Sequence, residues 1–342
     1  MDLMLAPMAE LSHRALRELI ASFGGCDAYF TEMISAAALL SGGEFEPYYM
    51  DNLPEPEKLV YQLAGAHEDQ LARAAALLDK RECAGIDINM GCAAPAITRT
   101  GAGIKWMYSP EKATKMIEKV RKSVKKRLSV KLRLGPGENF EYLLDFCRAL
   151  ENAGTELITL HPRTAREKFR RKARWQYVEA LAKELSIPVA GNGDIADAAE
   201  LALRAWGQDR GPWKAVMAGR AAVRRPWIFS QARLLKTASG SAGTEDAPQT
   251  NAVSGPVGAA TVLPEAAGKT PPALIEETGL RFLELLSRYQ PPPFHLSRAR
   301  RFFYYFCDNL IWGNHVKTLL NKEESLSGIA QARTKYFKSN AE

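Results

Sequence analysis

The sequence predicts a (β/α)8 or TIM barrel followed by a small all-helical carboxyl-terminal domain. Eight short apolar segments alternate with helical patterns over about the first 235 residues, the number and size typical of this barrel. A segment poor in aromatic and charged residues follows, and the last part of the chain has apolar residues at helical spacing. We therefore expect a barrel at residues 1–236, a low-complexity linker or insertion at 237–273 and a helical domain at 274–342.

Most of the eight apolar segments are uninterrupted runs, as expected for parallel strands that are buried on both faces. They are Leu3–Pro7, Ala28–Glu32, Leu59–Ala64, Gly85–Asn89, Ser129–Leu134, Glu156–His161, Ile187–Gly191 and Ala215–Gly219. The alternative is an open doubly wound sheet, which a GxGxxG motif after the first strand would favour. That position instead reads Ala6-Pro7-Met8-Ala9, so the barrel is preferred.

Helical patterns separate and follow these strands. In the barrel they are Ser12–Phe23, His67–Lys80, a helix from Ser109, Phe140–Asn152, Trp175–Leu185, Ala196–Trp206 and Ala221–Leu235. Ser12 and Ser109 are candidate N-caps, and Pro110 occupies a first helical position. In the helical domain they are Ile275–Tyr289, Ser297–Asn309, Asn314–Leu320 and Leu326–Phe337. The Ala-, Gly-, Ser-, Thr- and Pro-rich segment between the two regions reads as a linker, with an ordered surface loop as the alternative.

The composition is that of an ordinary globular protein, with 342 residues, 46% hydrophobic and 25% charged. Five cysteines are scattered without CxxC spacing, which argues against a zinc ribbon and for reduced thiols in the cytosol. No apolar run has the length of a membrane span, and the first residues do not resemble a signal peptide. We expect a cytoplasmic monomer that has no metal and no membrane anchor.

Active-site residues of such barrels lie at the carboxyl ends of the strands. These ends carry Gln62, Asn89, Cys92, Lys131, Arg133, His161, Arg163, Asn192, Gly193, Asp194, Gly219 and Arg220. Gly193 and Gly219 each lie between a strand and a helix, where a phosphate contact and an ordinary turn are both possible. Together with Arg220 they favour a phosphorylated cofactor at strands seven and eight.

Two of these polar residues, Lys131 and Gln62, are expected inside strands and call for hydrogen-bonding or charged partners. Lys131 interrupts an apolar strand, and a buried unpaired ammonium is costly, so we expect either a bound anion or a carboxylate such as Asp87 or Asp194. Gln62 offers a donor and an acceptor to a planar heterocycle, and a structural role is the alternative.

Cys92 is the thiol of most interest because it follows a strand end in a loop that bears Gly91, Pro95, Gly101 and Gly103. A thiol is mostly protonated at neutral pH and can serve as a general acid without special tuning. As a nucleophile it would need a nearby base, and no dedicated histidine is evident. The other cysteines are expected to be inert.

Two segments are strongly basic within a chain of net charge +7. Arg163–Arg174 has seven basic residues and one acidic residue, and it follows strand six on the expected active-site face. We expect phosphate-backbone contacts there. Lys115–Arg127 is equally basic but reads as the solvated face of a barrel helix. Most of the aromatic run Phe302–Phe306 must be core, which leaves one ring for stacking on a base.

The chain resembles the tRNA-dihydrouridine synthases through the whole barrel, residues 3 to about 231, and less distinctly through the helical tail. The motifs are APMA at 6–9, YQLAG at 61–65, IDINMGC at 86–92, VKLRLG at 130–135, LHPRT at 160–164, GNGDI at 191–195 and AGRAAVRRPWIF at 218–229. Each is weak alone, but in this order and spacing they are specific. One departure is Ala93, where the family usually has proline directly after the cysteine.

The resemblance implies an enzyme that uses FMN, with NADPH or NADH as donor, to reduce the C5=C6 bond of specific uridines in tRNA. It implies FMN contacts from Pro7, Met8, Ala9, Gln62, Lys131, His161, Asn192, Gly193, Asp194, Gly219 and Arg220. Cys92 would donate the proton to C5, and the helical domain would help to hold tRNA. For the substrate we expect contacts from Asn89, Arg163, Arg170, Arg171 and Lys172.

Two other functions remain as alternatives from the sequence. An FMN barrel that acts on a free pyrimidine would share the flavin site but would not need the basic segment or the helical domain. A non-catalytic tRNA-binding protein would not hold a flavin tightly.

Overall fold

The computed structural model describes residues 1–240 and 271–339, so most of the predicted linker at 237–273 lies outside the described residues. By its internal contacts the chain divides into two compact units. The first consists of Met1–His13, Asp27–Asp194 and Arg210–Gly219, and the second consists of Arg14–Cys26, Ile195–Asp209 and Arg220–Glu342. The predicted domain boundaries are not tested by this division and stay a prediction.

The first unit is built on one eight-stranded parallel sheet with the order β1-β8-β7-β6-β5-β4-β3-β2. Its strands are β1 (Asp2–Leu5), β2 (Tyr29–Ser35), β3 (Leu59–Ala64), β4 (Gly85–Met90), β5 (Arg127–Arg133), β6 (Leu157–His161), β7 (Val189–Asn192) and β8 (Ala215–Ala218). The two ends of the sheet meet where Met4 bridges Ala28 and the amide of Leu5 donates to the carbonyl of Ala28 at 2.9 Å. The predicted barrel is therefore confirmed.

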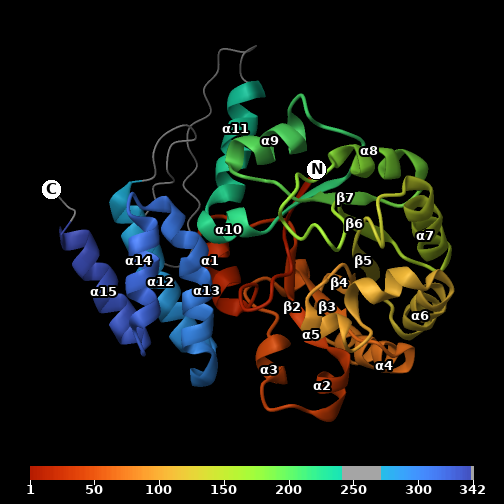
Figure 1. Ribbon diagram of the computed structural model, residues 1–342, viewed down its shortest axis with the longest axis horizontal. Helices are drawn as coiled ribbons and strands as arrows, with labels where there is room; N and C mark the ends of the chain where they lie inside the picture. The colour runs from red at the N-terminus through yellow and green to blue at the C-terminus, as the bar shows by residue number, and fades with distance from the viewer. Residues whose placement is uncertain (241–270, 340–342) are drawn as a thin grey trace. The chain divides into compact units, whose positions relative to one another are not determined.

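Seven helices belong to this unit: α2 (Ala36–Ser41), α3 (Glu46–Tyr49), α4 (Glu68–Asp79), α5 (Pro95–Thr98), α6 (Pro110–Ser123), α7 (Phe140–Asn152) and α8 (Trp175–Glu184). Two short 3-10 helices, η1 (Pro56–Lys58) and η2 (Gly103–Tyr108), accompany them. In Figure 1, α4, α6, α7 and α8 lie outside the strands, so the apolar outward faces of the strands are covered.

Among its described residues, the second unit has helices as its regular secondary structure and no strands. Its helices are α1 (Arg14–Ser22), α9 (Ala198–Trp206), α10 (Arg220–Arg224), α11 (Ile228–Gly240), α12 (Pro272–Tyr289), α13 (His295–Phe306), α14 (Gly313–Lys322) and α15 (Leu326–Ser339), with 3-10 turns η3 (Pro292–Phe294) and η4 (Cys307–Asn309). Helix α1 packs on α12, α9 on α11, and α10 on α13. A helical carboxyl-terminal region was predicted and is confirmed (Figure 1).

Some local predictions were wrong. The single helix expected over residues 221–235 is two helices, α10 and α11, which are separated at Arg225-Pro226-Trp227. Proline has no N–H to donate and disfavours a helical residue before it, which explains the break. Ser12 does not directly precede a helix, because α1 begins at Arg14, and its hydroxyl bonds instead to the backbone of Met8. Ser109 is the N-cap of α6, although its side chain makes no capping bond.

The aromatic run of α13 is mostly core, as predicted. Phe302 is fully buried and stacks on Phe282 with a centroid distance of 3.7 Å, and Phe303 and Phe306 are also buried. Tyr304 is 56% exposed. No helix among the described residues is both long and apolar enough to span a membrane.

Replacing Phe302 by alanine should lower the free energy of unfolding by about 3–5 kcal/mol, because a buried stacked ring leaves a cavity. Tyr304→Ala on the same helix is the matched control and should change it by about 0.5 kcal/mol. Urea unfolding followed by far-ultraviolet circular dichroism checks both. Equal effects would contradict the assignment of Phe302 to the core.

Candidate functional site

The side chains inside the barrel are apolar in one layer and polar toward the carboxyl ends of the strands. A buried apolar cluster drawn from six strands contains Met4, Phe30, Val60, Leu157 and Met217, so these side chains face the barrel axis. Residues at alternate positions of a strand share a face. The next inward positions toward the carboxyl ends are polar: Gln62 on β3, Asp87 and Asn89 on β4, Ser129 and Lys131 on β5, and Thr159 and His161 on β6. The barrel is therefore closed by an apolar layer and polar at its carboxyl end.

A buried row of hydrogen bonds crosses three strands at this end. Asp87 is fully buried and accepts a bond from the Ser129 hydroxyl at 2.6 Å and one from Gln62 Nε2 at 2.7 Å. Gln62 Oε1 in turn accepts from Asn89 Nδ2 at 2.8 Å. Burial raises the pKa of Asp87 to about 6, and the bonds from Ser129 and Gln62 oppose that rise. Gln62 is 0% exposed, so a contact of Gln62 with a heterocycle stays a prediction.

The backbone of Cys92 is held on both sides. Its N–H donates to Asn89 Oδ1 at 2.9 Å, and its carbonyl accepts from the Ile104 amide at 3.0 Å. Gly103 allows this approach, since it has φ +64° and a Cβ there would lie 2.4 Å from the Cys92 carbonyl oxygen. The Cys92 side chain is half-buried, and no disulfide involves it. The thiol thus projects from a backbone that is fixed by neighbouring residues.

Lys131 is paired in register with Asn89 on β4 and lies half-buried at the same end. Burial, together with the nearby charge of Arg133, lowers the pKa of Lys131 to about 8, while Asp87 and Cys92 act in the opposite direction. Within residues 1–240 and 271–339 its ammonium makes no hydrogen bond or ion pair. Neither carboxylate expected as its partner forms an ion pair with it, so the ammonium fits an anionic ligand.

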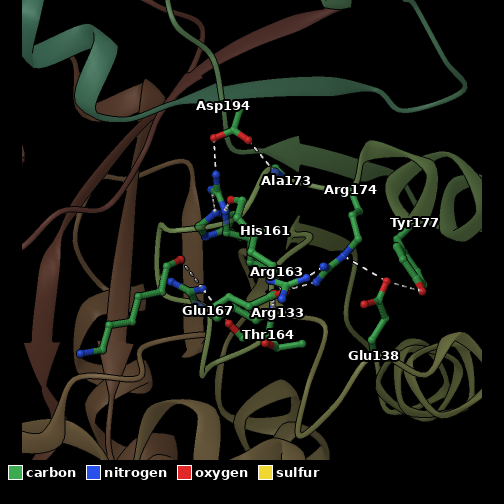
Figure 2. A network of polar contacts seen from close by, with 12 residues as sticks. Arg133, Glu138, His161, Arg163, Thr164, Glu167, Ala173, Arg174, Tyr177 and Asp194 are labelled. Carbon is green, nitrogen blue, oxygen red and sulfur yellow. Dashed lines mark hydrogen bonds and ion pairs between the residues drawn. The ribbon is translucent and has the colours of Figure 1, made fainter.

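Arg163, which was expected to contact the substrate, is buried, so that contact stays a prediction. Arg163 is 2% exposed, and Figure 2 shows its guanidinium between His161 and Asp194. Nη1 lies 2.9 Å from His161 Nε2, Nη2 pairs with Asp194, and Nε donates to the carbonyl of Arg171. Asp194 also accepts from the amide of Ala173. Arg163 therefore anchors the basic segment rather than presenting a charge to solvent.

A second set of polar contacts holds the carboxyl end of the basic segment, at Arg174. Arg174 donates two hydrogen bonds to Glu167 at 2.7 and 2.8 Å and forms an ion pair with Glu138 at 3.2 Å. Tyr177 donates to the same Glu138 at 3.0 Å (Figure 2). The hydrogen bonds from Arg174 lower the pKa of Glu167 to about 2. The segment is thus an ordered turn fixed at its two ends.

The cations between these anchors are exposed. They are Arg166, Lys168, Arg170, Arg171 and Lys172. The ring of Phe169 is exposed among them and lies 6.0 Å from the His161 ring. Of the four basic residues predicted to contact substrate, the structure therefore leaves three, Arg170, Arg171 and Lys172, open to solvent.

The remaining predicted cofactor residues lie in loops after β1, β7 and β8. Pro7, Met8 and Ala9 follow β1, and the Met8 amide is held by the Ser12 hydroxyl at 2.9 Å. Asn192 ends β7 and donates to the Met217 carbonyl at 2.8 Å. Gly219 ends the first unit, whereas Arg220 opens α10 in the second.

Packing alone accounts for glycine at position 193. Its φ is +122°, and a Cβ there would lie 2.9 Å from both Ala173 and His161. Its carbonyl accepts from the Trp175 indole at 3.0 Å. A phosphate contact from this residue therefore stays a prediction.

Neither Ser129 nor Glu167 was expected to have a role in the site, and Asp87 was expected only as a partner for Lys131. The signal for Asp87 was present, because Asp87 and Asn89 alternate with Ile86 and Ile88 and must share the interior face. No local pattern marks Glu167, whose role depends on a fold that brings Arg174 back to it. The other four cysteines are buried, as expected for inert residues.

Fold and site together define a (β/α)8-barrel protein with a thiol and an unpaired lysine at its polar end. A family model described as "Dihydrouridine synthase (Dus)" matches residues 4–254. The "Probable tRNA-dihydrouridine synthase" of Rickettsia prowazekii (strain Madrid E) is 30% identical over 240 residues, which are 69% of this chain and 72% of the relative. The "tRNA-dihydrouridine synthase B" of Yersinia pestis is 32% identical over 231 residues, 67% and 70% of the two chains. The chain therefore belongs to the dihydrouridine synthase family.

Solved structures support the fold alone. A 2-naphthoyl-CoA reductase complex aligns with a TM-score of 0.50 and 12% identity over 68% of this chain and 50% of that one.

Arg163→Ala should loosen the basic segment, because three charge-assisted or backbone contacts of one buried guanidinium disappear. We expect cleavage by trypsin between residues 166 and 172 to become at least tenfold faster, because the loss of even one charged hydrogen bond, roughly 1.5 kcal/mol, corresponds to about a tenfold change. Mass spectrometry of the early fragments gives the rate. Arg148→Ala, which removes an exposed pair with Glu184, is the control and should leave it unchanged. Equal cleavage in both variants would argue against the anchor.

Proposed function

We propose that this chain is an FMN-dependent tRNA-dihydrouridine synthase that reduces the C5=C6 bond of specific uridines in tRNA. The observation that carries the proposal is the placement of Cys92, whose backbone is fixed at the same barrel end as the unpaired Lys131. Membership of the dihydrouridine synthase family supports it. NADPH or NADH is the proposed electron donor.

The residues at the barrel mouth fit a bound FMN. Lys131 is an unpaired cation that an anionic group would neutralise, and Pro7, Met8, Ala9, His161, Asn192 and Asp194 follow or end the strands around it. Bound FMN, once reduced, supplies the hydride to C6 of the uracil. We propose further contacts from Gln62, Gly193, Gly219 and Arg220, as expected from the sequence.

The Cys92 thiol donates the proton that reduction of the C5=C6 bond needs in addition to the hydride. A hydride at C6 leaves negative charge on C5 and on O4 of the ring, and a thiol proton delivered to C5 neutralises it. The Cys92 thiol needs no base for this role, and the hydrogen bonds of Cys92 to Asn89 and Ile104 among the described residues involve the Cys92 backbone alone. Lys131 holds positive charge beside the site, where it stabilises developing negative charge.

The exposed cations of the segment that follows β6 give the tRNA a place to bind. We propose that Arg170, Arg171 and Lys172 contact phosphates, because these side chains are exposed while the segment is anchored at Arg163 and Arg174. The target base must leave its stack to reach a barrel mouth, and Asn89 is the proposed contact for its edge. The helical region and Tyr304 are proposed to support tRNA binding. Action as a metal-free monomer in the cytoplasm stays a prediction.

Cys92→Ala should slow uracil reduction about 10²–10⁴-fold, since water must replace a positioned general acid. The measurement is stopped-flow oxidation of the reduced flavin by tRNA, with dihydrouridine counted by mass spectrometry. Flavin content and reduction by NADPH should be unchanged, because neither needs the sulfur. Cys83→Ala, a buried thiol, is the control.

Three outcomes would contradict the proposal. Equal rates in Cys92→Ala and wild type would remove the thiol from the reaction. A colourless wild-type protein that does not take up FMN would favour a tRNA-binding protein. Reduction of free uracil but not of tRNA would favour a barrel that acts on free pyrimidines.

Flavin affinity should depend on pH through Lys131. The pKa of Lys131 in the free protein is about 8, and an anionic ligand favours the protonated form, so bound ligand raises that pKa. The Kd for FMN should therefore be flat from pH 7 to 8 and rise up to about tenfold per unit above it. Fluorescence titration of the stripped protein in a Cys92→Ala background checks this. The Lys131→Met protein should bind FMN more weakly, and its Kd should show no change of slope near pH 8. A pH dependence of the Kd identical to that of the unsubstituted Lys131 protein would contradict the proposed contact between Lys131 and FMN.

A further inference from the structure

A row of side chains links a buried carboxylate to the backbone of the thiol. The Cys92 amide donates to Asn89 Oδ1 at 2.9 Å, Asn89 Nδ2 to Gln62 Oε1 at 2.8 Å, and Gln62 Nε2 to Asp87 Oδ2 at 2.7 Å. The amide of Gly91 donates to the same Asn89 oxygen at 3.2 Å. Four residues on β3, on β4 and in the loop after β4 are thus joined in one line.

The two ends of this row allow only one arrangement of the amides between them. A carboxylate accepts and a backbone N–H donates, so Gln62 must present nitrogen to Asp87 and Asn89 must present oxygen to Cys92. If either amide turned over, a donor would face a donor and an acceptor would face an acceptor inside the barrel. Buried polar groups left without partners in this way are costly. Asp87 therefore determines how Gln62 and Asn89 are oriented.

We propose that Asp87 is a positioning residue that fixes the Cys92 backbone through Gln62 and Asn89, and so sets the place from which the thiol gives its proton. The positioning rests on the contacts above; its consequence for catalysis rests on the proposed function. Asp87 itself touches neither Cys92 nor any reacting atom in this account.

The need for a carboxylate at this position does not come from stability. Asp87 has no exposed surface, and taking a carboxylate out of water costs free energy that its two hydrogen bonds only partly offset. The neighbouring inward positions Val60 and Leu157 show that apolar residues fill the same interior. What Asp87 adds is an acceptor with a fixed direction, which an apolar residue cannot supply.

Three substitutions separate this role from simple packing. Asp87→Ala removes the acceptor for Gln62. Asp87→Asn keeps an oxygen toward Gln62 and places its amide against Ser129, whose hydroxyl can accept that bond and donate toward the Ile86 carbonyl at 3.5 Å. Ser129→Ala is the matched control, since it removes an equally buried bond to the same carboxylate on the side away from Cys92.

The test is hydrogen–deuterium exchange of the Gly91 and Cys92 amides in the flavin-loaded protein. We expect exchange about tenfold faster in Asp87→Ala and within about threefold of wild type in Asp87→Asn and Ser129→Ala. The rate of flavin oxidation by tRNA should fall in Asp87→Ala and be restored in Asp87→Asn, with reduction by NADPH unchanged in both. If Asp87→Ala does not fold, Gln62→Met interrupts the same row and should give the same exchange relative to wild type when both are measured without flavin, because Gln62 is itself a proposed flavin contact.

Two results would overturn the proposal. Exchange in Asp87→Ala that equals wild type would show that the row does not hold the loop. Equal acceleration in Ser129→Ala and Asp87→Ala would show that the effect is one of packing. Because amide exchange needs no tRNA, a wild-type protein that failed to reduce tRNA would refute the proposed function and leave the positioning result readable.

Discussion

The burial of polar side chains inside the barrel is the constraint on which the site depends. Asp87 has no access to solvent, so its two oxygens must be satisfied by protein donors, and Ser129 and Gln62 provide them. That requirement sets the direction of the next amide and, through Asn89, the hydrogen bond at the Cys92 backbone. The loop that carries Cys92 is therefore held by hydrogen bonds that begin at Asp87 in the barrel interior. On its other side, Gly103 lets the Ile104 amide donate to the Cys92 carbonyl.

The basic segment after β6, residues 163–174, contains two kinds of cation: buried or paired residues that anchor it, and residues that are exposed to solvent. Arg163 and Arg174 are tied to acidic side chains and to backbone carbonyls, while the cations between them face solvent. An exposed cation gains little from a surface ion pair but remains available for a phosphate. The order of the segment and its capacity to bind an anion therefore come from different residues of one sequence cluster.

The fold was largely predictable from sequence because strands buried on both faces leave uninterrupted apolar runs, and all eight were located to within a few residues. The break at Pro226 was missed because the helical spacing on its two sides is continuous. Helices α2 and α3 were missed because so few residues carry little periodicity. The strand ends could also be located from sequence, and Cys92, Lys131 and His161 end or follow strands at the carboxyl end of the barrel.

The contacts between these residues were less predictable. Arg163 reads as one more cation in a basic run, and only the tertiary fold shows that it is buried against Asp194. Glycine at position 193 fits a phosphate turn by sequence, yet the positive φ and the closeness of His161 already require it. Asp87 shows the same limit, because the sequence does not reveal what a buried carboxylate is bonded to.

The proposed function is the formation of dihydrouridine in tRNA, with the Cys92 thiol as the acid. Its most direct test is mass-spectrometric mapping of dihydrouridine in tRNA from cells that lack the gene, complemented with either the wild-type chain or the Cys92→Ala chain. At least one tRNA position should lose dihydrouridine in the deletion, regain it with the wild type and not regain it with Cys92→Ala. Unchanged dihydrouridine at every position in the deletion, or full restoration by Cys92→Ala, would contradict it.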